Sequence, residues 1–209
     1  MSLSIIRAAN FAALKHCDQR RKDATGTPYI NHPLGVMELA ADVGGVTDEA
    51  CLQACVLHDV LEDTDCSVAE MRHRFGDEVT DIVLECTDDK SLPKCKRKMA
   101  QIEHAPHMTA RGKTVKLADK LYNLRDLAAN RPPAWSRARA QGYFVWAWHV
   151  IAGLRGTNAG LEKMLDAVFE GDAVDADGAY PVLVEGEGLA GMLEEYLREM
   201  EIAGLTEDD

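Results

Sequence analysis

The stretch CVLHDVLED, residues 55–63, passes from an apolar segment to a cluster of groups that bind metals and protons. These groups are His58, Asp59, Glu62 and Asp63. Burying them is unfavourable unless they are paired or bound to a metal. Because residues three and four apart share one face of a helix, a helix through this stretch would place Glu62 beside both His58 and Asp59. A capped helix end with solvated acids remains the local alternative, although the apolar residues before His58 favour burial.

Helices of about 10 to 20 residues, separated by glycine and proline, account for the body of the chain, and no run of alternating residues indicates a strand. Thr47 is the predicted N-cap of the helix that ends at residues 55–63. The other predicted helices span residues 4–17, 33–43, 67–74, 76–86, 94–104, 110–129, 135–153 and 157–170. Residues 1–171 are therefore predicted to form one all-α domain.

Residues 172–209 differ from the body in charge. They hold twelve of the 35 acidic residues and one base, Arg198, so most of the formal net charge of −12 lies there. We expect a linker up to about residue 188 and then an amphipathic helix. Its apolar stripe consists of Leu189, Met192, Leu193, Tyr196, Leu197 and Met200. We predict that this stripe packs on the body, while docking on a second subunit, which would give a homodimer, or on another partner stays open.

Composition excludes several classes of protein. With 23 acids and 22 bases the body is nearly neutral, which argues against nucleic-acid binding. No apolar stretch is long enough to span a membrane, and the N-terminus resembles no signal peptide. The six cysteines are predicted to be reduced thiols, although Cys51 and Cys55, one helical turn apart, could also ligate a metal. We therefore expect a cytoplasmic protein.

Two distant residues could complete a metal site with His58 and Asp59. His32 immediately precedes a proline that fits the first turn of a helix, and Asp119 lies in helix 110–129 on a face other than the main apolar one. Two imidazoles and two carboxylates suit Mn, Fe or Zn better than Ca or Mg. On a metal that prefers six ligands, this set would leave positions for water and substrate.

The order of these residues resembles the H…HD…D signature of the HD-domain metal-dependent phosphohydrolases. Four longer stretches, RRKDATGTPYINHP, LHDVLEDTD, TDDKSLPKCKRK and VKLADKLYNLRDL, are similar to the hydrolase domain of the RelA/SpoT alarmone enzymes. The similarity is greatest to their small stand-alone relatives in animals. It covers about residues 5–171 and implies an HD-domain helical fold, with an acidic C-terminal extension that it does not explain.

The resemblance also implies roles for individual residues. The implied ligands of one Mn²⁺ ion are His32, His58, Asp59 and Asp119. Glu62 and Asp63 would orient or deprotonate the attacking water. The residues implied in substrate binding are Arg21, Lys22, Lys94, Asn123, Tyr143 and Arg139. In the family, the arginine that Arg21 matches stacks on the base.

The implied reaction is hydrolysis of the 3′-diphosphate of ppGpp or pppGpp to GDP or GTP and pyrophosphate. The animal relatives are also associated with removal of the 2′-phosphate of NADPH, and the motifs do not separate two substrates that both carry a phosphorylated ribose hydroxyl. An idle nucleotide-binding or scaffold protein is a third alternative, but the intact Glu62 and Asp63 argue against it. Because 209 residues leave no room for a synthetase domain, we expect hydrolysis only.

Overall fold

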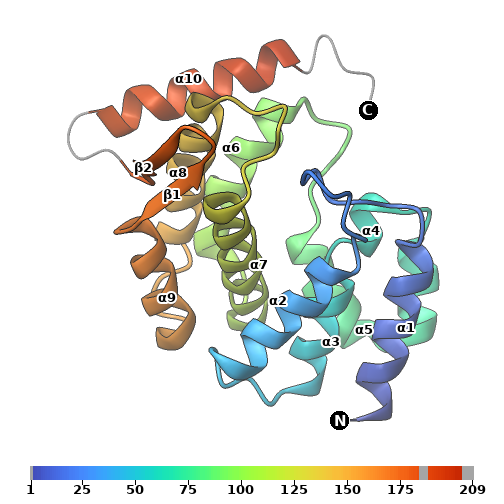
Figure 1. Cartoon of the computed structure of the whole chain (residues 1–209). Coiled ribbons are helices and arrows are strands. Elements are labelled where there is room, and N and C mark those ends of the chain that lie inside the picture. Colours follow the sequence, from blue (N-terminus) through green and yellow to red (C-terminus); the bar gives the residue numbers. More distant parts are fainter. Residues whose placement is uncertain (1, 184–187, 204–209) are drawn as a thin grey trace.

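The computed structural model describes residues 2–183 and 188–203 (Figure 1). The elements in chain order are α1 Leu3–Lys15, α2 Asn31–Asp42, α3 Glu49–Leu57, α4 Val60–Asp63, α5 Val68–Cys86, α6 Lys94–His104, a 3₁₀ turn η1 Ala105–His107, α7 Ala110–Ala129, α8 Arg137–Ala152, α9 Ala159–Phe169, β1 Asp172–Asp175, β2 Gly178–Pro181 and α10 Gly188–Ala203. Within the described ranges, no helix is both long enough and apolar enough to cross a membrane.

Helix α7 is the centre of the fold. It packs against α2, α3 and α5 on one side and against α8, α9 and β1 on the other, and Figure 1 shows it between these two groups. Its buried side chains include Val115, Leu117, Leu121 and Leu124, so the predicted apolar face is continuous with the core. Such burial on several sides is what makes a long helix stable within a small domain. The predicted all-α fold is confirmed.

The stretch 55–63 does not form one helix. Helix α3 ends at Leu57 and α4 begins at Val60, so His58 and Asp59 lie at the junction between them. The His58 ring makes a 2.8 Å hydrogen bond to the carbonyl of Cys55, one of the acceptors that a continuing helix would use. The expectation that His58, Asp59 and Glu62 share one helix face was therefore wrong.

Helix boundaries elsewhere follow the sequence closely, with one difference in detail. Asp48 rather than Thr47 is the N-cap of α3, because its carboxylate accepts the Ala50 N–H at 3.1 Å. The two helices predicted at 67–74 and 76–86 are both present within the element α5, and Gly76, whose φ of 79° is not helical, marks the break between them.

The segment after α9 is more ordered than a linker. Residues 172–181 form an antiparallel hairpin in which Ala173 pairs with Tyr180 and Asp175 with Gly178. Strands of only four residues are too short to show alternation in the sequence. Helix α10 then packs across α8 and α6, with Tyr196 and Met200 buried, so the predicted packing of the stripe on the body is confirmed. Residues 184–187 of the expected linker, and residues 204–209, lie outside the described residues.

Candidate active site

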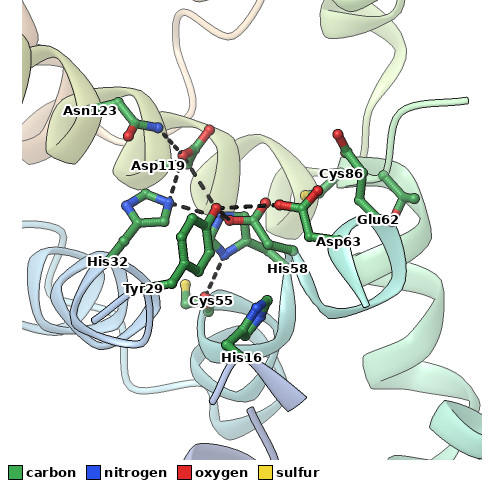
Figure 2. A network of polar contacts seen from close by, with 12 residues as sticks. His16, Tyr29, His32, Cys55, His58, Glu62, Asp63, Cys86, Asp119 and Asn123 are labelled. Carbon is green, nitrogen blue, oxygen red and sulfur yellow. Dashed lines mark hydrogen bonds and ion pairs between the residues drawn. The ribbon is translucent and has the colours of Figure 1, made fainter. Parts of the chain in front are cut away.

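Three of the four side chains predicted as metal ligands, His32, His58 and Asp59, offer ligand atoms that lie within 4.8 Å of one another. The fourth, Asp119, points toward His32 and His58 (Figure 2). His32 comes from α2, Asp119 from α7, and His58 and Asp59 from the junction of α3 and α4. His32 Nε2 lies 3.5 Å from Asp59 Oδ2 and 3.3 Å from Asp119 Oδ1, and His58 Nε2 lies 3.0 Å and 3.7 Å from the same two atoms. Two atoms that bind one ion at right angles, each about 2.1 Å away, are about 3 Å apart, so this cluster has the dimensions of a metal site.

The orientation of His58 supports metal binding. Its Nδ1 contacts the Cys55 carbonyl, which can only accept, so we assign a proton to Nδ1, and Nε2 is the atom that carries either a second proton or a metal ion. Within the described residues this buried Nε2 atom has no hydrogen-bond partner. A buried imidazole lone pair that faces two carboxylates is unfavourable by itself. A cation at the meeting point would bind all three groups.

The charges around the cluster also favour a bound cation. Burial alone would raise the pKa of the Asp119 carboxyl, but Lys120, His32 and His58 outweigh it and hold that pKa well below its usual range. Burial would likewise lower the pKa of His58, yet Asp59 and Asp119 raise it to about 10. The two carboxylates thus strongly favour positive charge at this point. A divalent ion would supply this positive charge and would displace the proton from His58.

The predicted water-activating pair lies next to the cluster, but its two members point to different partners. Glu62 Oε2 accepts the N–H of Asp88 at 2.9 Å, and burial is the main reason that the pKa of Glu62 rises to about 7. Asp63 forms a 2.7 Å ion pair with Lys90 and lies 3.5 Å from the hydroxyl of Tyr29. Glu62 therefore has a pKa suited to proton transfer near neutral pH.

A pocket of about 300 Å³ opens directly beside the cluster. Its lining residues are Arg20, Arg21, Lys22, Asp23, Tyr29, Asp63, Asn123, Asp126, Leu127, Asn130, Pro132, Trp135 and Tyr143. Tyr29 donates to Asp59 Oδ2 at 2.6 Å, and Asn123 donates to Asp119 Oδ1 at 2.6 Å. The same pocket therefore reaches from basic and aromatic side chains to the predicted metal ligands.

Four of the six residues predicted to bind substrate, Arg21, Lys22, Asn123 and Tyr143, line this pocket. Arg21 is held in place by Asn123 and by a 2.6 Å ion pair with Asp126. The other two predicted residues do not line it. The Arg139 guanidinium lies 4.6 Å from the ring centroid of Trp135, and Lys94 is the first residue of α6.

The sequence interpretation missed three residues of the site. Tyr29 supports Asp59, and Lys120 lies 3.0 Å from Asp119; both stand close in sequence to predicted ligands, which was the available signal. Lys98 extends over the Trp146 ring with its Nζ 3.6 Å from the centroid. Burial and the neighbouring Lys120 lower the pKa of Lys98 to about 7. No local pattern distinguishes Lys98 from the other bases of α6.

Comparison with known proteins places this site in a family. Residues 8–153 match the model of the HD domain. The chain belongs to the HD-domain family. All four predicted metal ligands fall within the matched range, whereas the hairpin and α10 lie beyond it.

Several HD-domain proteins are similar over most of their length. A frog relative (Xenopus tropicalis), named guanosine-3′,5′-bis(diphosphate) 3′-pyrophosphohydrolase MESH1, is 58% identical over 165 residues, which are 79% of this chain and 92% of the relative. The human protein of the same name is 53% identical over 79% of this chain and 93% of its own. A solved structure described as a metazoan orthologue of SpoT that hydrolyses ppGpp superposes with a TM-score of 0.79 at 48% identity, covering 81% of this chain and 95% of that one.

Proposed function

We propose that this HD-domain protein hydrolyses the 3′-diphosphate of ppGpp or pppGpp and releases pyrophosphate with GDP or GTP. One observation carries the proposal: Tyr29 and Asn123 line the pocket and at the same time hydrogen-bond to the ligands Asp59 and Asp119. A nucleotide in this pocket would thus have its ribose phosphates next to the metal cluster. The names of the frog and human relatives support this reaction.

We further propose that one Mn²⁺ ion is held by His32, His58, Asp59 and Asp119. Their two imidazole nitrogens and two carboxylates are a donor set that Mn, Fe or Zn accepts, and the unpartnered Nε2 of His58 supports the fit. When bound, such an ion would polarise a phosphoryl oxygen and lower the pKa of a water molecule. The remaining steps depend on side chains of the protein.

Glu62 is the proposed general base. With a pKa of about 7 it is largely ionised just above neutral pH and can take a proton from the attacking water. The water oxygen forms the new bond to phosphorus, the bond from phosphorus to the ribose 3′ oxygen breaks, and that oxygen takes up a proton. Asp63, oriented by Lys90, would position the water. Tyr29 keeps its hydroxyl proton, because burial and Asp59 raise its pKa far above the usual range.

The rest of the pocket supplies groups for the nucleoside and the phosphates. Trp135 and Tyr143 offer aromatic faces on which a purine can stack, and the guanidinium of Arg21 offers a second planar surface. Lys22 in the pocket lining brings positive charge to a highly anionic substrate. Because the groups that would bind the nucleoside are separate from the metal ligands, we predict that the aromatic residues determine substrate affinity and the metal ligands determine the rate of hydrolysis.

Two alternatives from the sequence have gained no support. The names of the relatives refer to guanosine bis(diphosphate), so NADPH as the substrate is not favoured, and none of the comparisons points to the suggested homodimer. We propose a cytoplasmic location, which suits the six cysteines, all of them free thiols.

A single assay tests the proposal. Metal-free protein is incubated with ppGpp or with NADPH, with and without Mn²⁺, and released pyrophosphate and phosphate are measured. We expect Mn²⁺-dependent pyrophosphate from ppGpp, and its loss in the Glu62→Ala, Asp63→Ala double variant. Phosphate from NADPH without pyrophosphate from ppGpp would favour the alternative substrate. No turnover of either would exclude both enzymatic functions.

A further inference from the structure

One buried carboxylate connects the C-terminal extension to the wall of the pocket. Asp175 is the last residue of β1, and its side chain is only 4% exposed. It accepts hydrogen bonds from Arg131 Nε at 3.1 Å and from Arg137 Nε at 2.7 Å. One acid thus binds two arginines that come from a different part of the chain.

The two arginines stand at the ends of a pocket loop. The segment 131–137 runs through the connection between α7 and α8 to the first residue of α8, and within it Pro132 and Trp135 line the pocket. Arg131 also donates from Nη1 to the carbonyl of Trp135. Asp175 is therefore linked through Arg131 to the backbone that positions the Trp135 ring.

The hairpin itself orients this carboxylate. The N–H of Asp177 donates to Asp175 Oδ1 at 2.9 Å, and Gly178, with a φ of 109°, closes the turn. Arg137 lies 4.9 Å from the ring centroid of Tyr180 and donates to the carbonyl of Gly178 at 3.2 Å. The acid is thus pre-organised to receive both guanidinium groups, and neutralising it would leave two arginines without their common partner.

Helix α10 reaches the same wall at a second point. Tyr196 is buried against Gly142, the residue before Tyr143, and the rings of Tyr196 and Tyr143 are 6.5 Å apart in an edge-to-face arrangement. The hairpin and α10 therefore support the two aromatic residues that line the nucleoside end of the pocket. Both elements lie outside the part of the chain that matches the HD domain.

We propose that Asp175 is a positioning residue for nucleoside recognition: it holds the 131–137 loop so that Trp135 can stack on the base. This inference rests on the proposed function and extends it to the C-terminal extension. It assigns to Asp175 an effect on substrate affinity, exerted through Arg131 and Trp135, and no part in bond breaking.

The test compares Asp175→Asn with Asp172→Asn in the full-length, Mn²⁺-loaded protein. Asp172 is an exposed acid on the same strand, so its variant removes the same charge without touching the loop. Pyrophosphate release from ppGpp gives kcat and KM for each variant. We expect Asp175→Asn to raise KM roughly five- to thirty-fold with kcat within about twofold, and Asp172→Asn to change neither.

Repeating the substitution in a Trp135→Leu variant distinguishes a positioning role of Asp175 from a general loss of structure. If Asp175 acts through Trp135, Asp175→Asn will raise KM in the wild type but have little further effect in the Trp135→Leu variant. Arg131→Lys, which keeps the charge but loses the forked geometry, repeats the test on the other partner. An unchanged KM, an equal rise in both backgrounds, or a loss confined to kcat would overturn the inference. Absence of ppGpp turnover in the wild type would overturn the proposed function as well.

Discussion

The proposed metal end of the pocket, formed by His32, His58, Asp59 and Asp119, and its proposed nucleoside end, formed by Trp135 and Tyr143, are built in different ways. At the metal end, His32, His58 and Asp119 are almost fully buried and come from packed helices. At the nucleoside end, Trp135 lies on a loop whose position depends on ion pairs with the hairpin. If the protein has the proposed function, the core fixes the chemistry and side-chain contacts at the surface determine the affinity. Substitutions at the two ends should therefore separate kcat and metal binding from KM.

The largest effect is expected at the metal end, from Asp119→Asn. The amide keeps the shape of the side chain but loses the negative charge that a ligand to Mn²⁺ supplies, and it leaves Lys120 without its acid. We expect the purified protein to retain little Mn²⁺ by elemental analysis and to lose pyrophosphate release beyond detection.

Asp42→Asn is the matched control, because Asp42 is an exposed acid at the end of α2, the helix that carries His32. It should retain both metal and activity. Full Mn²⁺ content in Asp119→Asn would show that this residue is not a ligand and that the metal end is not defined by these four side chains.

Glu62→Gln should have the next largest effect and leave the metal in place. Loss of a general base typically lowers the rate by about 10²- to 10⁴-fold. Because the base acts when ionised, and its pKa is about 7, wild-type kcat/KM should rise with pH up to about 7 and then level off. The variant should retain its Mn²⁺, show a lower kcat and lack this rise. A variant that keeps the wild-type pH profile would assign the base elsewhere, Asp63 being the first candidate.

The sequence predicted which side chains meet in the His and Asp cluster better than it predicted the lining of the pocket, and the reason is physical. Imidazole and carboxylate groups next to apolar helical residues, such as His58 and Asp119, have few roles apart from metal binding or catalysis, so their pattern in the sequence indicates a site. The roles of Asp175 and Arg131 arise from a contact between segments 44 residues apart, and each residue alone looks like an ordinary surface charge. The break between α3 and α4 was missed because it depends on the His58 side chain, which helix propensity does not describe.

Tyr29→Phe tests the contact between the two ends and should have an intermediate effect. The substitution removes the 2.6 Å hydrogen bond to Asp59 and leaves the ring in the pocket. Groups that orient a metal ligand in this way typically change metal affinity by about 10- to 100-fold. Titration of the metal-free protein with Mn²⁺ measures the change.

Tyr122→Phe is the control for Tyr29→Phe. The Tyr122 ring also packs against His32, with centroids 4.9 Å apart, but its hydroxyl has no hydrogen bond to another described residue. It should bind Mn²⁺ as the wild type does. Equal affinities for all three proteins would mean that Tyr29 belongs to the nucleoside end alone.

The smallest effect is expected from Gly142→Ala, which acts on the nucleoside end through the contact of Tyr196 with Tyr143. An added Cβ would lie 2.7 Å from the Cβ of Tyr196, so α10 must shift away from α8. Such overpacking lowers the free energy of unfolding by roughly 1–3 kcal/mol, and the better helix propensity of alanine offsets up to about 1 kcal/mol of that.

Gly191→Ala on α10, where an added Cβ meets open space, should stabilise the protein slightly and is the control. For Gly142→Ala, thermal unfolding should show a lower Tm, and ppGpp kinetics should show a modestly higher KM. Its kcat and Mn²⁺ content should be unchanged. A fall in kcat alone would show that the two ends of the pocket are not independent.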